Sequence, residues 1–505
     1  MSENLFSVFT AAAPADRAKP FIHRPDGSVI TYRDMEEDTA RIANILSAMG
    51  LSPGDRVAVQ VDKSAEVLLV YLACLRLGAV YIPFNAAYTI AELRYLLADA
   101  EPKLFICRPE RFRESVELTH ELGLAHIRTL GVARDGTLLG KLGDAKTSFT
   151  DHSCAGDDLA AILYTSGTTG RSKGAMLSHD NLASNARTLK DFWRFTSEDR
   201  LLHALPIFHT HGLFVATNIA LMAGAAMLLL PAFDVGEIIR LLPRATVMMG
   251  VPTFYTRLLA QADFTAETAK NIRLFISGSA PLAATTHREF SARTGHAILE
   301  RYGMTETNMN TSNPYEGERI AGSVGKPLPG IDIRIADPAS GEEVAAGDVG
   351  QIEIKGPNVF KGYWRSPEKT AAEFRSDGFF MSGDLGFQDD KGYVHIVGRN
   401  KDLIISGGFN VYPAEVEGVI EEIEGVAQCA VIGAPHADFG EAVIAVVVPK
   451  PGVMLSEDGI ARATSERLAN YKRPKRIVIA SELPLNAMGK VQKNILREQH
   501  RTAFQ

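Results

Sequence analysis

The feature that constrains the fold most is a regular alternation of short apolar strands and helices through the first half of the chain. The pattern begins with a strand over residues 56–61, a helix over Ala65–Leu77, a strand over Val80–Pro83, a helix over Ile90–Ala98 and a strand over Leu104–Cys107. Strands separated by helices at this spacing pair in parallel, with the helices covering the faces of the sheet. We therefore predict an α/β fold in which helices flank parallel-rich sheets.

The pattern changes in the last third of the chain. After about Gly322, glycines and prolines recur among short strands, which predicts a small, mostly antiparallel β subdomain. The segment 398–403 is interpreted as a join, and helices and strands are mixed beyond it. We therefore predict a large N-terminal domain of residues 1–400 and a mobile α+β lid domain of residues 401–505.

Composition excludes several classes of protein. The 505 residues carry 53 Lys and Arg against 60 Asp and Glu, a net charge of −7 without runs of like charge, which argues against a nucleic-acid partner. The four cysteines stand far apart, in neither a zinc nor a disulfide spacing, and fit a reducing compartment. The uncharged stretch from Gly212 to Phe233 is long enough to span a membrane, but Gly224 and Pro231 divide and close it. We expect a cytoplasmic protein without a signal peptide or a membrane span.

A glycine-rich stretch from Tyr164 to Gly174 is the first candidate functional segment. It follows an apolar strand and combines three glycines with hydroxyl side chains, Arg171 and Lys173. Backbone N–H groups of such a loop can converge on a polyphosphate, while the two cations oppose its charge. The spacing is not that of a Walker loop. A flexible surface turn remains the alternative on composition alone.

Three later segments add further chemistry. The segment 204–212 contains His209 and His211 beside aromatic residues, but no third metal ligand is nearby, and structural histidines are the alternative. A strand ending in the small residues 277–280 lets the backbone approach a planar ring. The segment 300–307 offers Tyr302 to stack on a base, Thr305 to bond phosphate and Glu306 to hold Mg²⁺. Taken singly, each is an ordinary surface polar group.

In this order the segments resemble the signature motifs of the adenylate-forming enzymes, the superfamily of acyl-CoA synthetases, luciferases and peptide-synthetase adenylation domains. The resemblance covers nearly the whole chain. It implies the use of ATP and Mg²⁺, with coenzyme A as co-substrate. The implied ATP- and AMP-binding residues are Thr165, Ser166, Gly167, Thr168, Thr169, Gly170, Lys173, Ser277, Gly278, Ser279, Ala280, Glu300, Arg301, Tyr302, Gly303, Thr305, Asp384, Arg399 and Lys490.

The resemblance also implies individual roles. Lys490, in the segment 486–490, matches the lysine that bridges the attacking carboxylate and the α-phosphate, and Glu306 and Thr165 complete the implied catalytic set. Lys401 matches the hinge position. The implied CoA-binding residues are Ser406, Gly407, Gly408, Phe409 and Lys472, and a solvated basic face is the alternative for Lys472. An acyltransferase that modifies Lys490 is a regulatory hypothesis.

The acid substrate is the least constrained part of the function. The implied substrate-binding residues are His209, Arg257, Ser277, Gly303 and Met304. An arginine directed at an acyl pocket is costly unless the substrate supplies a counter-charge, as a dicarboxylate does. The segments 203–214, 250–259, 300–318 and 356–364 resemble the malonate-activating branch of the superfamily, whereas Leu485 and Ala414 depart from the usual pattern.

We therefore predict ATP-dependent ligation of malonate to CoA, with methylmalonate as a second substrate. Ligation of another short acid and the loading of a carrier protein are alternatives from the same class. A nucleotide-binding protein without catalysis is the alternative from another class, and the presence of Lys490 and Glu306 weighs against it. An arginine on the exposed side of its helix is the alternative for Arg257.

Overall fold

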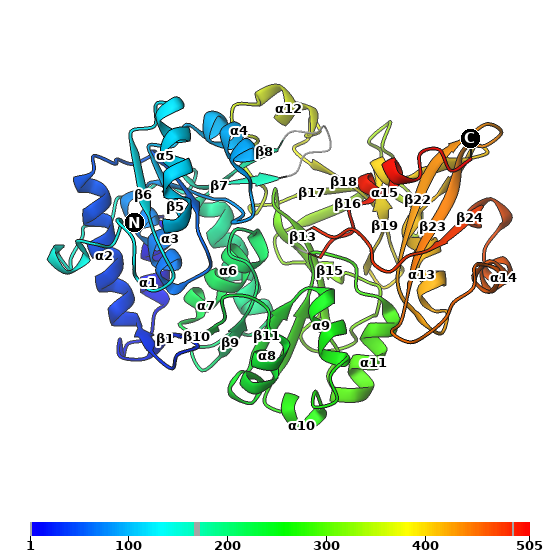
Figure 1. The fold of residues 1–505 in the computed structure, drawn as a ribbon, viewed down its shortest axis with the longest axis horizontal. Helices are drawn as coiled ribbons and strands as arrows, with labels where there is room; N and C mark the ends of the chain where they lie inside the picture. The colour runs from blue at the N-terminus through cyan, green and yellow to red at the C-terminus, as the bar shows by residue number, and fades with distance from the viewer. Residues whose placement is uncertain (1–2, 166–171, 487–488, 505) are drawn as a thin grey trace.

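The structure is a computed structural model that describes residues 3–165, 172–486 and 489–504. In this part of the chain the strands form four sheets, and helices cover the two largest of them (Figure 1). The glycine-rich residues 166–170 of the predicted phosphate loop, and Arg171, lie outside the described residues. The expected fold class, parallel-rich sheets flanked by helices with a small β subdomain and an α+β C-terminal part, is confirmed.

The first large sheet has the strand order β6-β5-β3-β4-β7-β8. Its strands are β3 (Arg56–Gln60), β4 (Val80–Pro83), β5 (Leu104–Cys107), β6 (His126–Thr129), β7 (Leu159–Thr165) and β8 (Lys173–Ser178). All its pairings are parallel except that of β8, which runs antiparallel to β7. The helices between these strands are α3 (Ala65–Leu77), α4 (Ile90–Ala100) and α5 (Phe112–Glu121).

Helix α3 shows why the sequence forms these elements where it does. The Ser64 side chain accepts a hydrogen bond from the Val67 N–H, which caps the first turn. The helix ends at Gly78, whose φ of 74° is the left-handed conformation that glycine adopts without strain. All residues of α3 are buried, so this nearly uniformly apolar helix lies inside the molecule rather than on its surface.

The second large sheet has the order β15-β14-β13-β12-β11-β9-β10-β1-β2. Its strands are β1 (Pro20–His23), β2 (Val29–Thr31), β9 (Arg200–His203), β10 (Ala226–Leu229), β11 (Val247–Gly250), β12 (Leu274–Ser277), β13 (Leu299–Met304), β14 (Asn308–Ser312) and β15 (Lys326–Pro327). The accompanying helices are α1 (Leu5–Ala12), α2 (Tyr32–Ala48), α6 (His179–Phe192), α7 (Asn218–Ala223), α8 (Val235–Leu241), α9 (Pro252–Leu259), α10 (Ala266–Ala269) and α11 (Ala284–Thr294). Strands β9 to β13 pair in parallel, so their carboxyl ends meet at one edge, where ligands bind in open α/β sheets.

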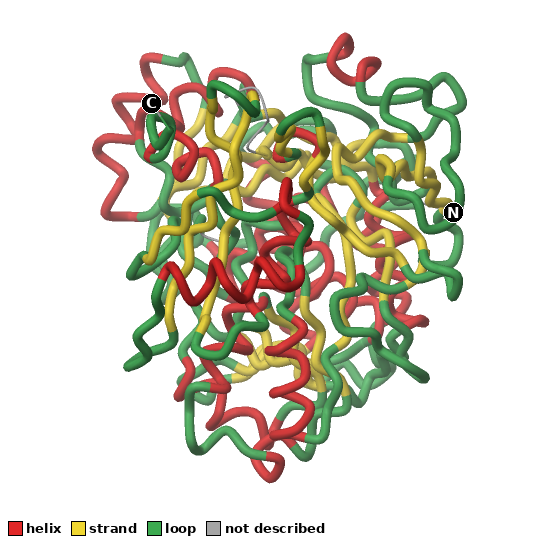
Figure 2. The backbone as a smooth tube through the Cα atoms, turned by 90° about the vertical axis from the view of Figure 1, so that its right-hand side faces the viewer, coloured by secondary structure: helices red, strands yellow, loops and turns green. Residues whose placement is uncertain are grey.

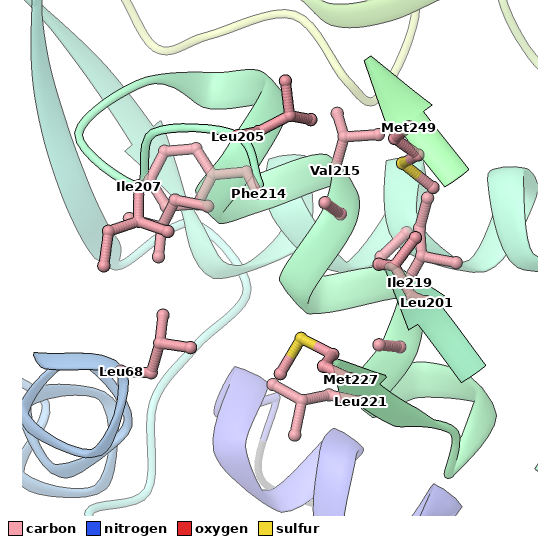
Figure 3. Packing of buried hydrophobic residues seen from close by; sticks show 14 of the residues in the cluster. Leu68, Leu201, Leu205, Ile207, Phe214, Val215, Ile219, Leu221, Met227 and Met249 are labelled. Carbon is pink, nitrogen blue, oxygen red and sulfur yellow. The ribbon is translucent and has the colours of Figure 1, made fainter. Parts of the chain in front are cut away.

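The long uncharged stretch forms part of the core. Residues His211–Thr217 form a π-helix, α7 follows, and Gly224 ends that helix in the left-handed conformation before β10 begins. Figure 3 shows Phe214, Val215 and Ile219 from this stretch among other buried apolar side chains. The apolar character therefore reflects burial within the protein, and none of the described helices is long and apolar enough to cross a membrane.

The elements after residue 403 lie toward the right in Figure 1 and nearer the viewer in Figure 2, whereas α12 (Pro367–Ala372) lies at the top centre of Figure 1. An antiparallel sheet contains β16 (Asp332–Ala336), β17 (Gly350–Lys355), β18 (Phe380–Gln388) and β19 (Val394–Arg399), with α12 between β17 and β18. A 3₁₀ turn over Asn400–Asp402 leads into the last sheet, whose elements are β20 (Ile404–Ser406), β21 (Phe409–Val411), α13 (Pro413–Glu421), β22 (Val426–His436), β23 (Gly440–Pro449), α14 (Glu457–Arg467), β24 (Arg476–Ile479) and α15 (Lys493–Gln499). Two apolar clusters in this last part contain only residues after Leu403. The boundary at residue 400 remains a prediction.

Candidate active site

Strand ends position most of the residues predicted to bind nucleotide. Ser277 ends β12, and Gly278, Ser279 and Ala280 follow it. Glu300, Arg301, Tyr302, Gly303 and Met304 lie on β13, whereas Thr305 and Glu306 lie in the turn that leads to β14. A Cβ on Gly303 would stand 1.9 Å from the Asn308 carbonyl oxygen, so only glycine fits at this turn. Burial raises the pKa of the Glu300 carboxyl to about 8.

Asp384, Arg399 and Tyr302 form the nucleotide end of the site, and the protein alone assembles it. Asp384 and Arg399 are register partners on β18 and β19, with Arg399 Nε 3.0 Å from Asp384 Oδ1. The Tyr302 hydroxyl donates to Asp384 Oδ2 at 2.5 Å. The Asp384 side chain is nearly buried, and its charge raises the pKa of Arg399. The carboxylate of Asp384, which the resemblance implies to bind the nucleotide, is thus already oriented.

Glu306 and Lys173 form the phosphate and metal end. The Tyr363 hydroxyl lies 3.1 Å from Glu306 Oε1 and 2.6 Å from Glu373 Oε2, and Lys173 Nζ lies 3.7 Å from Glu373 Oε1. Lys173 pairs in register with Thr165 across β7 and β8, which places both at the mouth of the glycine-rich loop. Burial raises the pKa of Glu306 and lowers that of Lys173.

A magnesium ion fits this end of the site. Glu306 is 7% exposed and presents a hard oxygen donor of the kind that Mg²⁺ prefers. Among the described residues there is no group of three or more His, Cys, Asp or Glu side chains that could hold a metal. The ion therefore needs phosphate oxygens to complete its coordination, as is usual for Mg²⁺ in nucleotide sites.

Lys490 reaches this site from the C-terminal part of the chain. The Lys490 N–H donates to Asn486 Oδ1 at 3.0 Å, and a Cβ on Gly489 would lie 3.1 Å from Thr253 Oγ1 at the start of α9. Burial, together with the charges of Arg399 and Arg301, lowers the pKa of Lys490 to about 8. The negative charges of Asp384 and Glu306 act to raise the pKa of Lys490. Lys490 therefore lies close to charged groups of both the nucleotide end and the phosphate end of the site.

The acyl end contains His209, His211 and Ser279. His209 Nδ1 accepts a hydrogen bond from the His211 N–H at 3.2 Å, and Ser279 Oγ lies 3.3 Å from His211 Nδ1. Burial and the charges of Lys490 and Arg301 lower the pKa of His209 to about 3, so this imidazole is neutral near pH 7. Ser279 has a φ of 73°, a left-handed conformation that costs a non-glycine residue energy and that is frequent at functional sites.

Arg301 and Arg257 have opposite environments. Arg301 is 3% exposed and lies against Gly278, where a Cβ would come within 2.4 Å of the guanidinium carbon. Arg257 is exposed on α9, with its guanidinium 5.8 Å from the centroid of the Phe233 ring. The buried face of α9 consists of Phe254, Tyr255, Leu258 and Leu259. The sequence argument expected a buried arginine at position 257. In the structure Arg257 is exposed, because it lies outside the buried face of α9.

Four of the predicted CoA-binding residues lie on the hairpin of β20 and β21, and Lys472 lies in the 3₁₀ turn Asn470–Lys472. Gly407 and Gly408 have φ values of 59° and 83°, which define the two-residue turn that favours glycine. Ser406 is buried, while Phe409 is exposed and stacks on Tyr471 with ring centroids 4.8 Å apart. Lys472 Nζ lies 2.5 Å from Glu415 Oε1 and forms an ion pair with it. Their role in binding CoA remains a prediction.

Lys401 lies in the 3₁₀ turn between β19 and β20, at the junction predicted to act as a hinge. Burial and the Arg399 charge lower its pKa. Arg288 Nη2 on α11 lies 3.7 Å from Glu422 Oε1, and this ion pair joins residues on either side of the junction. The hinge role remains a prediction.

Sequence reasoning missed three residues of the site. Tyr363 lies within the segment 356–364, whose resemblance to the superfamily was noted, so a signal for it existed. Thr253, which lies beside Gly489, falls within the segment 250–259 and carried the same kind of signal. Glu373 carried no signal, because its role depends on contacts with Tyr363 and Lys173 that only the fold creates.

This fold, with the paired Asp384 and Arg399, the buried Glu306 and a lysine from the C-terminal part of the chain nearby, is the one expected of an ATP-dependent acid–CoA ligase that forms an acyl-adenylate. The AMP-binding enzyme family matches residues 9–364, and the AMP-binding enzyme C-terminal domain matches residues 415–490. The chain belongs to this family of adenylate-forming enzymes, which use ATP, Mg²⁺ and CoA.

Individual relatives and solved structures are similar to the chain over nearly its whole length. The chain is 37% identical to a feruloyl-CoA synthase of Amycolatopsis sp. over 96% of this chain and 97% of the relative. It is 33% identical to the malonate–CoA ligase of Arabidopsis thaliana over 98% and 89%. The ATP-bound structure of MatB from Rhodopseudomonas palustris is 55% identical, covers all of both chains and has a TM-score of 0.98. The apo structure of MatB has the same identity and coverage but a TM-score of 0.87, so the present structure is closer to the ATP-bound form.

Proposed function

We propose that this ligase joins malonate to CoA, with methylmalonate as a second substrate. The observation that carries the proposal is the sign of the charge at the acyl end. The charge of Arg301 lowers the pKa of His209, and Arg301 Nε and Nη2 are buried without a hydrogen-bond partner among the described residues. A second carboxylate on the acid would pair this buried cation, whereas a monocarboxylate would leave it unpaired. The likeness to MatB and to the malonate–CoA ligase supports the same substrate.

The residues of the site would divide the reaction between them. A malonate oxygen attacks the α-phosphorus of ATP, and the bond to pyrophosphate breaks, which gives malonyl-AMP. Lys490 stabilises the charge that develops between the two reactants, and Asp384 holds the ribose hydroxyls. Mg²⁺, when bound at Glu306, neutralises the phosphate oxygens. The CoA sulfur then attacks the acyl carbon and AMP leaves.

The runner-up is an aromatic acid, because a feruloyl-CoA synthase is 37% identical. A neutral aromatic tail would enter the acyl end without a partner for Arg301. Another short acid has the same shortcoming unless it carries a second anionic group. A carrier protein as acyl acceptor concerns the second half-reaction only and does not change the argument for the acid.

An acid panel tests the proposal. Pyrophosphate release is measured with ATP, CoA and malonate, methylmalonate, butyrate or ferulate in turn. We expect the specificity constant for malonate to exceed that for butyrate by several orders of magnitude, on the order of 10⁴ for a site built around a polar substrate group. Equal turnover of butyrate or ferulate would contradict the proposal. Replacing CoA with a carrier protein identifies the acceptor.

The acyltransferase acting on Lys490 is a separate proposal. In this structure Lys490 is half-buried and close to the charges of Arg399 and Glu306, so modification would require the loop to leave the site. Mass spectrometry of the native protein tests for acylated Lys490, and an unmodified lysine under all growth conditions would remove the proposal.

A further inference from the structure

Lys63 is a buried lysine that links the two large sheets. It lies between β3 of the first sheet and α3, and it is 9% exposed. Its Nζ lies 3.1 Å from Nδ1 of His203 and donates to the His203 carbonyl oxygen at 2.8 Å. His203 ends β9 of the second sheet and is 1% exposed. Among the residues that the structure describes, both hydrogen bonds of this lysine are therefore made with one histidine.

The contacts of His203 decide which ring nitrogen carries the proton. Nε2 lies 2.9 Å from the Gly212 carbonyl oxygen and 3.2 Å from Thr217 Oγ1. A carbonyl oxygen only accepts, and the Thr217 hydroxyl donates its own proton to the same carbonyl oxygen, so Nε2 must donate. Burial and the Lys63 charge lower the pKa of His203, so the ring is neutral and Nδ1 carries no proton. Lys63 supplies the donor that Nδ1 needs.

Gly212 closes the turn that carries His209. The Gly212 N–H donates to the His209 carbonyl oxygen at 3.1 Å. A Cβ on Gly212 would stand 2.1 Å from the Pro206 carbonyl oxygen, so the two arms of the turn are in contact there. The π-helix His211–Thr217 begins at this point, and single turns of π-helix are frequent at functional sites. The His203 ring thus holds this turn by the carbonyl group of Gly212.

The surroundings of Lys63 would suit an apolar side chain better than a cation. Burial lowers the pKa of Lys63 well below its ordinary value, because an ammonium group is costly to desolvate. Leu68 of the adjoining helix α3 belongs to the same apolar cluster as Ile207 and Phe214 (Figure 3). A methionine would fit such surroundings without that cost, but it has no hydrogen to donate. The contribution of Lys63 therefore lies in its hydrogen bonds.

We infer that Lys63 is a positioning residue for the acyl end of the site. It fixes the His203 ring with the proton on Nε2, the ring fixes the Gly212 carbonyl group, and the closed turn then presents His209 in one orientation. The inference rests on the proposed function only for the choice of acid, since any acid–CoA ligase must position its acid. A displacement of about 1 Å can slow a reaction about a hundredfold.

Two substitutions separate the donor of Lys63 from the volume of its side chain. Lys63→Met keeps an unbranched chain without a donor, whereas Lys63→Gln keeps an N–H donor. We expect Lys63→Met to lower kcat/KM for malonate at least about tenfold, mainly through KM, and Lys63→Gln to recover part of the loss. The Kd for ATP should stay within about threefold, because the Asp384–Arg399 pair is held by contacts of its own. Pyrophosphate release measures the rates, and calorimetry measures the Kd.

A double-mutant cycle tests whether Lys63 acts through His203. His203→Phe removes both ring contacts and keeps a planar ring. In that background Lys63→Met should change kcat/KM for malonate by less than about twofold, against at least about tenfold in the wild type. Losses that multiply would show that Lys63 acts by another route and would overturn the inference.

Lys103→Met is the matched control. Lys103 Nζ donates to the Gly50 carbonyl oxygen at 2.7 Å and lies 2.9 Å from Asp55 Oδ2, so this lysine also ties separate segments together. It precedes β5, whereas Lys63 follows β3, and the two strands are parallel, so the lysines lie at opposite edges of the first sheet. Lys103→Met should leave the KM for malonate within about twofold.

The pattern of kinetic changes distinguishes positioning from a general loss of structure. Partial unfolding leaves fewer active molecules, which lowers kcat and leaves KM unchanged; this pattern in Lys63→Met overturns the inference. Should Lys63→Met not fold, His203→Asn decides, because it keeps an acceptor for Lys63 and removes the donor to Gly212. A raised KM supports the inference, and an unchanged KM overturns it. If another acid proves the best substrate, the proposed function fails, and the same comparison with that acid decides about Lys63.

Discussion

The two ends of the active site differ in how the protein treats its buried charges. At the nucleotide end, Asp384 is paired with Arg399 and accepts a hydrogen bond from Tyr302 before any ligand is present. At the acyl end, Arg301 is equally buried, yet two of its nitrogens have no partner among the described residues. The protein satisfies the first group itself and leaves the second unsatisfied.

The contrast separates a general function from a specific one. Every member of an adenylate-forming family must bind the same nucleotide, so a preassembled nucleotide end serves any acid. An unpaired charge at the acyl end raises the free energy of the empty site and is relieved only by a substrate of the right charge. Specificity for the acid would thus depend on what the protein leaves unpaired.

The largest effect on activity is expected for substitution of Lys490, which lies between the nucleotide end and the acyl end of the site. Lys490→Ala should slow adenylation at least about a hundredfold, because it removes a donor to the charge that develops in the transition state. Thioester formation from supplied malonyl-AMP should continue. Pyrophosphate release measures the first step, and CoA consumption with supplied adenylate measures the second. A parallel loss of both steps would show that the lysine has a structural or shared role.

The pairing of Asp384 with Arg399 at the nucleotide end is expected to stabilise the ligand-free protein against unfolding. Asp384→Asn removes the charge that pairs with Arg399 and should lower the free energy of unfolding of the ligand-free protein by about 1–3 kcal/mol. Arg301→Met should leave that free energy unchanged or raise it, because it removes a buried charge that has no partner. Urea unfolding of both variants beside the wild type tests the contrast. Equal destabilisation by both substitutions would erase the difference between the two ends.

The junction between β19 and β20 offers a smaller effect with a defined direction. Lys401 occupies the middle of the 3₁₀ turn Asn400–Asp402, and Pro243 occupies the middle of the similar turn Leu242–Arg244. Proline therefore fits the conformation in which Lys490 is in the site, but it fixes φ and hinders rotation of the C-terminal part. We expect Lys401→Pro to retain adenylation and to slow thioester formation by about tenfold or more.

Single-turnover measurements of the two half-reactions test this expectation, with Lys401→Ala as the control for loss of the side chain. Equal slowing of both steps in Lys401→Pro, or none, would argue against a hinge at this residue.

The smallest effect concerns pH. Lys490 has a pKa of about 8 in the ligand-free site, below its ordinary value of 10.5. Between these two values a solvent-exposed lysine binds more protons than the docked one, so docking becomes more favourable as pH rises through this window. Stabilisation of the transition state needs the protonated lysine, and bound anions raise its pKa. We therefore expect kcat/KM for malonate to fall above about pH 8 and kcat to fall only at higher pH.

The two pH profiles in wild type and in Lys490→Arg check this prediction. The arginine variant should lose the fall near pH 8 because its guanidinium does not deprotonate there. Coincident profiles for kcat and kcat/KM in the wild type would contradict it.

The sequence predicted the local elements and the parallel pairing of the first strands, but it missed one antiparallel strand. Helix Ala65–Leu77 and strands Val80–Pro83 and Leu104–Cys107 have the predicted bounds, because apolar runs with clear ends define them. The antiparallel strand β8 after the glycine-rich loop was not predicted, since its pairing with β7 leaves no mark in the periodicity.

The candidate site shows the same limit at the level of single side chains. The predicted positions of Asp384, Arg399 and Tyr302 meet because the register of β18 and β19 and the end of β13 place them together. Whether Arg257 or Arg301 points toward the acyl end depends on which face of its element each residue occupies. One sequence does not contain that information for a helix of eight residues or a strand end.

A crystal structure with malonate and a non-hydrolysable ATP analogue tests the central claim most directly. The account predicts one malonate carboxylate beside Lys490 and the other within hydrogen-bond distance of Arg301 Nε and Nη2, with the Asp384–Arg399 pair and the Tyr302 contact unchanged. A second carboxylate on Arg257 or in solvent, with both Arg301 nitrogens still unpaired, would contradict it.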